Sequence, residues 1–138
     1  MALIVDASVA VAWAIDNEGE TITRGALASA LNEGFAAPHH FPIEVANGLL
    51  RAERKDRVSR NDIDVFLLDL SKMTMRLDTP IDLDRLRDVL TLGRRYMITA
   101  YDAAYVELAL RTSLPLATRD SAMAQAAAKA GVKLFSAG

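Results

Sequence analysis

Two stretches decide the fold: Ala2-Leu3-Ile4-Val5-Asp6 near the start of the chain and Leu114-Pro115-Leu116-Ala117-Thr118-Arg119-Asp120 near its end. Each is a short apolar run that stops at polar residues, a pattern typical of a buried strand. Three other runs have the same character. The complete set of expected strands covers residues 3–5, 35–37, 75–77, 114–117 and 132–135.

Helical patterns fill the segments between these strands. We expect helices over residues 7–15, 21–32, 43–55, 59–73, 83–95, 101–111 and 120–130. Pro42 suits the first turn of the third helix, and Ser59 can cap the fourth. Strands that alternate with helices favour an α/β fold, in which helices cover both faces of a parallel sheet.

Length and composition limit the class of protein. The chain has 138 residues, of which 51% are hydrophobic, so we expect one domain over residues 1–138 with a sizeable core. It has no cysteine, which excludes disulfides and thiolate metal sites. No apolar run is long enough for a membrane span, and the start does not resemble a signal peptide. We therefore expect a cytoplasmic protein without membrane contact.

Charge is distributed unevenly along the chain. The formal net charge is −2, yet residues 1–50 carry six acids and only one basic side chain, Arg24. The basic excess of the remainder is greatest in the segment with Arg51, Arg54, Lys55, Arg57 and Arg60. Such a segment can contact a polyanion, or it can be the solvated end of a helix. The sequence leaves both interpretations open.

Four acids are expected at one edge of the sheet. Asp6 and Asp120 follow apolar strands, whereas Glu44 and Asp102 lie in the first turns of expected helices. In open α/β sheets the working crevice lies beyond the carboxyl ends of the strands. Each acid taken alone is explained by its favourable position at a helix start. Together they would repel one another unless protons or cations occupied the cluster.

The chemistry of the ligands indicates which cation would fit. Oxygen donors without cysteine favour Mg²⁺ or Mn²⁺, which can promote hydrolysis of phosphodiesters. His39 and His40 match no familiar zinc spacing, so they are not expected to be ligands. Tyr101 and Tyr105 can stack on bases or pack beside the strand ends.

Further side chains near the acids are candidates for supporting roles. Ser8 and Thr118 can orient a carboxylate or a water molecule, although both can also serve as helix caps. Asn47 and Arg51 lie three and seven residues after Glu44, on the same face of a helix. Arg51, together with Arg119, is a candidate for contact with the substrate backbone.

These residues resemble the motifs of PIN-domain proteins over essentially the whole chain. The four motifs, in order, are Leu3-Ile4-Val5-Asp6-Ala7-Ser8-Val9-Ala10-Val11, Pro42-Ile43-Glu44-Val45-Ala46-Asn47-Gly48-Leu49, Ile98-Thr99-Ala100-Tyr101-Asp102-Ala103-Ala104-Tyr105 and Leu114-Pro115-Leu116-Ala117-Thr118-Arg119-Asp120. The compact size and the opening motif are similar to those of VapC-like toxins of bacterial and archaeal toxin–antitoxin pairs. One departure is Ala12, where many relatives carry a lysine.

The resemblance implies a three-layer α/β/α sandwich with a five-stranded parallel sheet. It also implies a Mg²⁺- or Mn²⁺-dependent endoribonuclease whose metal ligands and catalytic residues are Asp6, Glu44, Asp102 and Asp120. The implied substrates are structured RNAs of the tRNA or ribosomal RNA class. The implied partners are a second copy of the chain and a small VapB-like antitoxin that blocks the site.

Two other functions are compatible with the sequence. A PIN-like module can bind metal and RNA, or an antitoxin, without turnover. A phospho-receiver domain is also α/β and acid-rich, and Asp78 follows the third strand as such a domain requires. However, Asp6 is not part of an acid pair, and the chain nearly ends after the last expected strand.

Overall fold

The structure is a computed structural model that describes residues 3–15 and 20–136. Its centre is a parallel sheet with the strand order β3-β2-β1-β4. The strands are β1 (Ile4–Val5), β2 (Phe35–Ala37), β3 (Met75–Leu77) and β4 (Leu116–Ala117). Because all of them run in one direction, their carboxyl ends meet at one edge. The chain moves outward from β1 to β3 and returns on the other side of β1 with β4, so the order reverses between β1 and β4.

The prediction of a fifth strand over residues 132–135 is wrong, because this segment forms too few backbone contacts to count as a strand. The segment after α7 lies beside β4 and pairs with it through one isolated bridge, between Leu116 and Leu134. Two backbone hydrogen bonds of 2.9 Å flank that bridge, from Leu116 N to Lys133 O and from Phe135 N to Leu116 O. The partner strand β4 is itself only two residues long, so it offers little backbone for a longer ladder. Within the described residues the sheet therefore has four strands.

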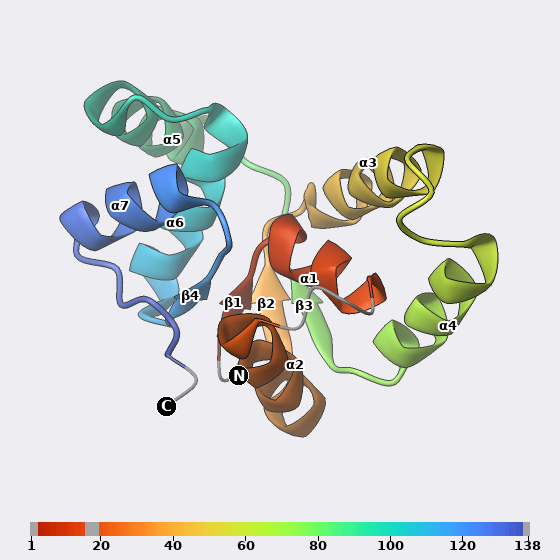
Figure 1. Cartoon of the computed structure of the whole chain (residues 1–138). Coiled ribbons are helices and arrows are strands. Elements are labelled where there is room, and N and C mark those ends of the chain that lie inside the picture. The colour runs from red at the N-terminus through yellow and green to blue at the C-terminus, as the bar shows by residue number, and fades with distance from the viewer. Residues whose placement is uncertain (1–2, 16–19, 137–138) are drawn as a thin grey trace.

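Helices cover both faces of the sheet, as the alternating pattern predicted. In Figure 1, α5, α6 and α7 gather on one side of the strands, and α1, α3 and α4 lie on the other. The helices are α1 (Ala7–Ala14), α2 (Thr21–Glu33), α3 (Phe41–Arg54), α4 (Arg60–Ser71), α5 (Leu83–Tyr96), α6 (Ala100–Thr112) and α7 (Ser121–Ala130). None of the helices in the described ranges combines the length and apolar character needed to cross a bilayer.

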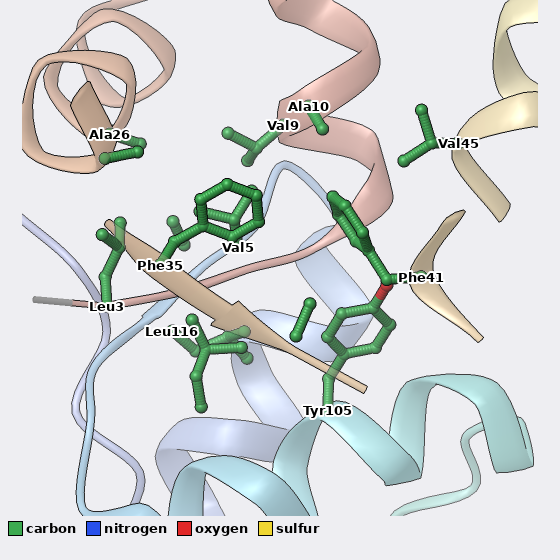
Figure 2. Packing of buried hydrophobic residues seen from close by; sticks show 14 of the residues in the cluster. Leu3, Val5, Val9, Ala10, Ala26, Phe35, Phe41, Val45, Tyr105 and Leu116 are labelled. Atoms are coloured by element: carbon green, nitrogen blue, oxygen red, sulfur yellow. The ribbon is translucent and has the colours of Figure 1, made fainter. Parts of the chain in front are cut away.

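The core joins the strands to the helices on either side. Leu3, Ile4 and Val5 are fully buried, in keeping with a central strand covered on both faces. Figure 2 shows Tyr105 rising from α6 towards Phe41 at the start of α3, with Phe35 beside Phe41. These contacts fix the start of α3, which carries Glu44, relative to α6.

A charged network attaches the α5–α6 pair to the end of β3. The carboxylate of Asp78 accepts hydrogen bonds from both Arg85 and Arg111, and the buried Glu107 pairs with the same two arginines. Glu107 raises the pKa of Arg111, since the ion pair favours the charged guanidinium. Asp78 is therefore a structural anchor, not the exposed acceptor that a phospho-receiver domain would need.

Candidate active site

Asp6 lies at the carboxyl end of β1, where the strand order reverses. Its side chain is almost fully buried, with 3% exposed. Oδ1 accepts hydrogen bonds from Ser8 Oγ (2.7 Å) and from the backbone N–H of Val9 (3.1 Å), and Oδ2 accepts one from Thr118 Oγ1. Burial raises the pKa of Asp6, whereas these hydrogen bonds oppose the rise because they favour the charged form. Ser8 and Thr118 thus hold the carboxylate in place. A hydroxyl group that orients a carboxylate was expected at both positions, but the pairing of Thr118 with Asp6 was not.

Glu44 comes from the first turn of α3 and is held from the opposite face of the sheet. Tyr105 of α6 donates a 2.9 Å hydrogen bond to its Oε1. His40 Nε2 lies 3.0 Å from the same oxygen but is not aligned for a hydrogen bond. Burial raises the pKa of Tyr105, and the charge of Glu44 raises it further. Tyr105 therefore remains a protonated donor that orients Glu44.

Asp102 and Asp120 lie at the starts of two further helices. Thr99 caps α6 by accepting from the backbone N–H of Asp102 (3.1 Å), and Asp120 caps α7 by accepting from Met123 N (3.0 Å). The pKa of Asp102 is raised to about 6, first by burial and then by the charges of Asp120, Glu44 and Asp6. Each of the other three acids thus lies close enough for its charge to raise the pKa of Asp102. The structure brings all four to one region.

The cluster can accept a divalent cation, although its acids do not form a closed ligand set. In the part of the chain that the structure describes, no group of three or more His, Asp or Glu side chains is arranged to hold a metal ion. Mg²⁺ does not require such a cage, because it keeps several waters and is commonly held by one or two carboxylates. The donors are carboxylate oxygens, and a bound cation would reduce the repulsion between their negative charges. On these grounds the residues fit Mg²⁺ or Mn²⁺.

A cavity of about 410 Å³ extends from Glu44 between α1 and α3. Ser8 and Asn47 line it near the acids, and its cationic side chains are Arg51, Lys55, Arg57 and Arg119. The placement of Asn47 and Arg51 beside Glu44 is the one expected from helical spacing. Lys55 and Arg57 are additions to the residues predicted from sequence, and both come from the basic segment that follows Arg51. Arg119 also pairs with Glu20, at 3.1 Å.

A second, mostly apolar cavity of about 580 Å³ lies on the other side of His40, between α5 and the start of α6. Tyr101 lines it and is 61% exposed, whereas Tyr105 is only 1% exposed. Stacking of a base is therefore excluded for Tyr105, which packs in the core. His40 was not expected at the site; its only sequence signal is its position four residues before Glu44, one helical turn away.

Comparison with known proteins places the chain beside a family model and a solved structure. A family model described as "PIN domain" matches residues 3–129. The crystal structure of PAE2754 from Pyrobaculum aerophilum is similar, with a TM-score of 0.66 and 27% sequence identity over 91% of this chain and 79% of that one. No curated protein matches.

Proposed function

The chain belongs to the PIN-domain family, and on that premise we propose that it is a divalent-metal-dependent endoribonuclease that acts as the toxin of a toxin–antitoxin pair. PIN domains are generally nucleases that use divalent metal ions. The observation that supports the proposal is the placement of Asp6, Glu44, Asp102 and Asp120 in one region, with Thr118 linking Asp6 to the backbone of Asp120 and with burial and the three other charges raising the pKa of Asp102. All four acids of the family pattern are present.

The ion would lie among Asp6, Glu44, Asp102 and Asp120, with one or two of these carboxylates in direct contact and the others reaching it through its waters. When bound, Mg²⁺ or Mn²⁺ supplies polarisation of the phosphoryl group and activation of water. The protein supplies the orientation of the acids: Ser8 and Thr118 fix the oxygens of Asp6, and Tyr105 fixes Oε1 of Glu44. Ser8 also accepts a hydrogen bond from the backbone N–H of Arg119, which ties the ends of β1 and β4 together.

The cavity between α1 and α3 offers a path for the RNA backbone. Arg51, Lys55, Arg57 and Arg119 line it, and Glu44 lies at the same cavity. Cationic side chains bind phosphates without reading sequence, so they can place a strand across the acids and leave target choice to the shape of the RNA. We propose tRNA or ribosomal RNA as the substrate class.

An antitoxin of the VapB-like class is the proposed protein partner. An apolar cavity of about 420 Å³ lies between α3 and α4, where Val45, Leu49, Ile63 and Leu67 are among its lining residues. An amphipathic helix can dock its apolar face in a groove of this kind. Because α3 also carries Glu44, a peptide bound there would be well placed to obstruct the acids.

Cleavage of RNA by matched variants tests the proposed activity. Asp6→Asn and Asp120→Asn each remove a charge at nearly constant volume, so both should abolish Mg²⁺- or Mn²⁺-dependent cleavage of a tRNA and rRNA pool while the fold persists. Asp64→Asn, at an exposed position of α4, is the control and should cleave like the wild type. Full cleavage by both site variants would refute the proposal. So would metal binding by the wild type without cleavage, which would instead indicate a binding module.

A further inference from the structure

The cavity of about 580 Å³ between α5 and the start of α6 has the size of a small-molecule site. We call it the Tyr101 cavity. Its lining includes His40, Ile81, Leu83, Leu86, Ala100 and Tyr101. The cationic cavity between α1 and α3 is lined by a different set of residues, so the two cavities are separate.

His40 connects the Tyr101 cavity to the acids. Its ring lines that cavity, and its Nε2 lies 3.0 Å from Glu44 Oε1. Glu44 in turn lines the cationic cavity. On α6, Tyr101 directly precedes Asp102. A group bound in the Tyr101 cavity would therefore lie next to residues that contact or adjoin two of the four acids.

The two cavities differ in the chemistry of their walls. Arginine and lysine side chains line the cationic cavity, which suits phosphates. Among the described residues that line the Tyr101 cavity there is neither lysine nor arginine. Its carboxylate, Asp82, caps α5 by accepting a 2.9 Å hydrogen bond from the backbone N–H of Arg85. The Tyr101 cavity therefore suits an uncharged and largely apolar group.

The ring of Tyr101 is restrained but accessible. It makes an edge-to-face contact with the ring of His40, with 5.5 Å between the centroids and an angle of 64°. The side chain nevertheless remains 61% exposed. Proteins that recognise unpaired RNA commonly stack its splayed bases on aromatic side chains of this kind.

We propose that the Tyr101 cavity binds an unpaired base of the RNA substrate, stacked on Tyr101, from a nucleotide beside the scissile phosphate. The inference rests on the proposed nuclease function and adds a base subsite to it. An apolar side chain of another protein could also fill the cavity. The link to the acids through His40 favours a group that a phosphodiester brings with it, because a nucleotide joins an apolar base to a charged phosphate.

Mononucleotides test the subsite without requiring cleavage. Nucleoside 5′- and 3′-monophosphates would be titrated into the wild-type chain with Mg²⁺ and followed by the NMR signals of the tyrosine rings. At least one series should bind roughly 5–150-fold more tightly than the same sugar phosphate without its base, which is the contribution of one stacked base. Tyr101→Ala should remove that advantage, whereas Tyr101→Phe keeps the ring and should retain it. Equal affinity with and without the base would overturn the proposal.

Two leucines provide a matched pair that locates the base. Leu86 and Leu90 lie one turn apart on α5 and are both 43% exposed, but only Leu86 lines the Tyr101 cavity. Leu86→Asn should weaken mononucleotide binding by roughly fivefold or more, and Leu90→Asn should leave it unchanged. Circular dichroism and thermal unfolding check that both variants fold. If both instead lower the mass in sedimentation equilibrium and neither changes base binding, a second copy of the chain covers the cavity, which would overturn the proposal.

RNA that lacks a single base separates this inference from the nuclease activity. An abasic nucleotide would be placed on either side of a mapped cleavage site, and at one of the two positions it should lower kcat/KM by roughly 5–150-fold. Cleavage that is indifferent to the loss of either base would overturn the subsite and leave the nuclease proposal intact. Base-dependent binding of mononucleotides by a wild type that cleaves no RNA would support the subsite and refute the nuclease proposal.

Discussion

Replacing Gly48 by alanine should destabilise the protein, although alanine is the better helix former. Gly48 lies within α3 and faces Val11 of α1. A Cβ atom at this position would lie 2.7 Å from Val11 Cγ2 and 3.6 Å from Val11 Cβ and Cγ1. A valine in a helix has one strongly preferred rotamer, so the methyl group cannot turn aside freely. The two helices would have to separate instead.

The size of the effect follows from two opposing contributions. Removing a glycine from a helix interior gains about 1 kcal/mol. Forcing an extra carbon into a packed contact costs about 1–3 kcal/mol. The expected net loss of unfolding free energy is therefore about 1 kcal/mol, and at most about 2, which corresponds to a fall of roughly 3–6 °C in Tm for a chain of this size.

A double-mutant cycle with Val11→Ala isolates the contact. Val11→Ala removes the two methyl groups that the new Cβ would meet, so Gly48→Ala should stabilise the protein in that background. Urea unfolding of the four proteins should give a coupling free energy of about 1–3 kcal/mol. The reasoning would be refuted if Gly48→Ala stabilised the otherwise unchanged chain, or if the coupling lay below about 0.5 kcal/mol.

Three further predictions concern the acid cluster and the charged network. Tyr105→Phe removes the donor to Glu44 and should weaken Mn²⁺ binding, measured by calorimetry, by about 10–100-fold; unchanged affinity would contradict the orienting role. The folded pKa of Asp102, about 6, exceeds its ordinary value of 3.8, so folding favours the protonated acid. With metal removed by a chelator, the free energy of unfolding of the wild type should therefore fall, relative to that of the Asp102→Asn variant, as pH rises from about 4 to about 6. Parallel pH profiles of the two proteins in urea unfolding would contradict this. Asp78→Asn should cost about 1–3 kcal/mol in the same assay, since two arginines lose the negative charge that they share, whereas the exposed Asp64→Asn should cost nearly nothing.

Local interactions made much of the fold predictable. The ranges of β2 and β3 are those expected from sequence, because short apolar runs bounded by polar residues depend only on near neighbours. Thr99 caps α6 and Ser59 caps α4 through contacts three residues along the chain. Gly34 ends α2 with φ +79°, as expected of a glycine after a helix. The fifth strand was not predictable in the same way, because its extent depends on how much of β4 is available for pairing.

The partners of the polar groups were not predictable from local pattern. Tyr105 donates to Glu44 across 61 residues, and Thr118 donates to Asp6 across 112. Arg85 and Arg111 share Asp78 only because α5 and α6 pack together at the end of β3. The apolar spacing in α5 predicted a helix, but it did not predict that much of the apolar surface of this helix would face solvent.

The sequence by itself determined which acids end strands or begin helices, because those positions follow from propensity and capping over a few residues. Only the tertiary structure decided that these acids share one region, that Tyr105 and His40 accompany Glu44, and that the charges of three acids act on Asp102. The physical reason is distance. Burial and charge interactions depend on separations in space, and the residues concerned meet only after the strands have taken their order in the sheet.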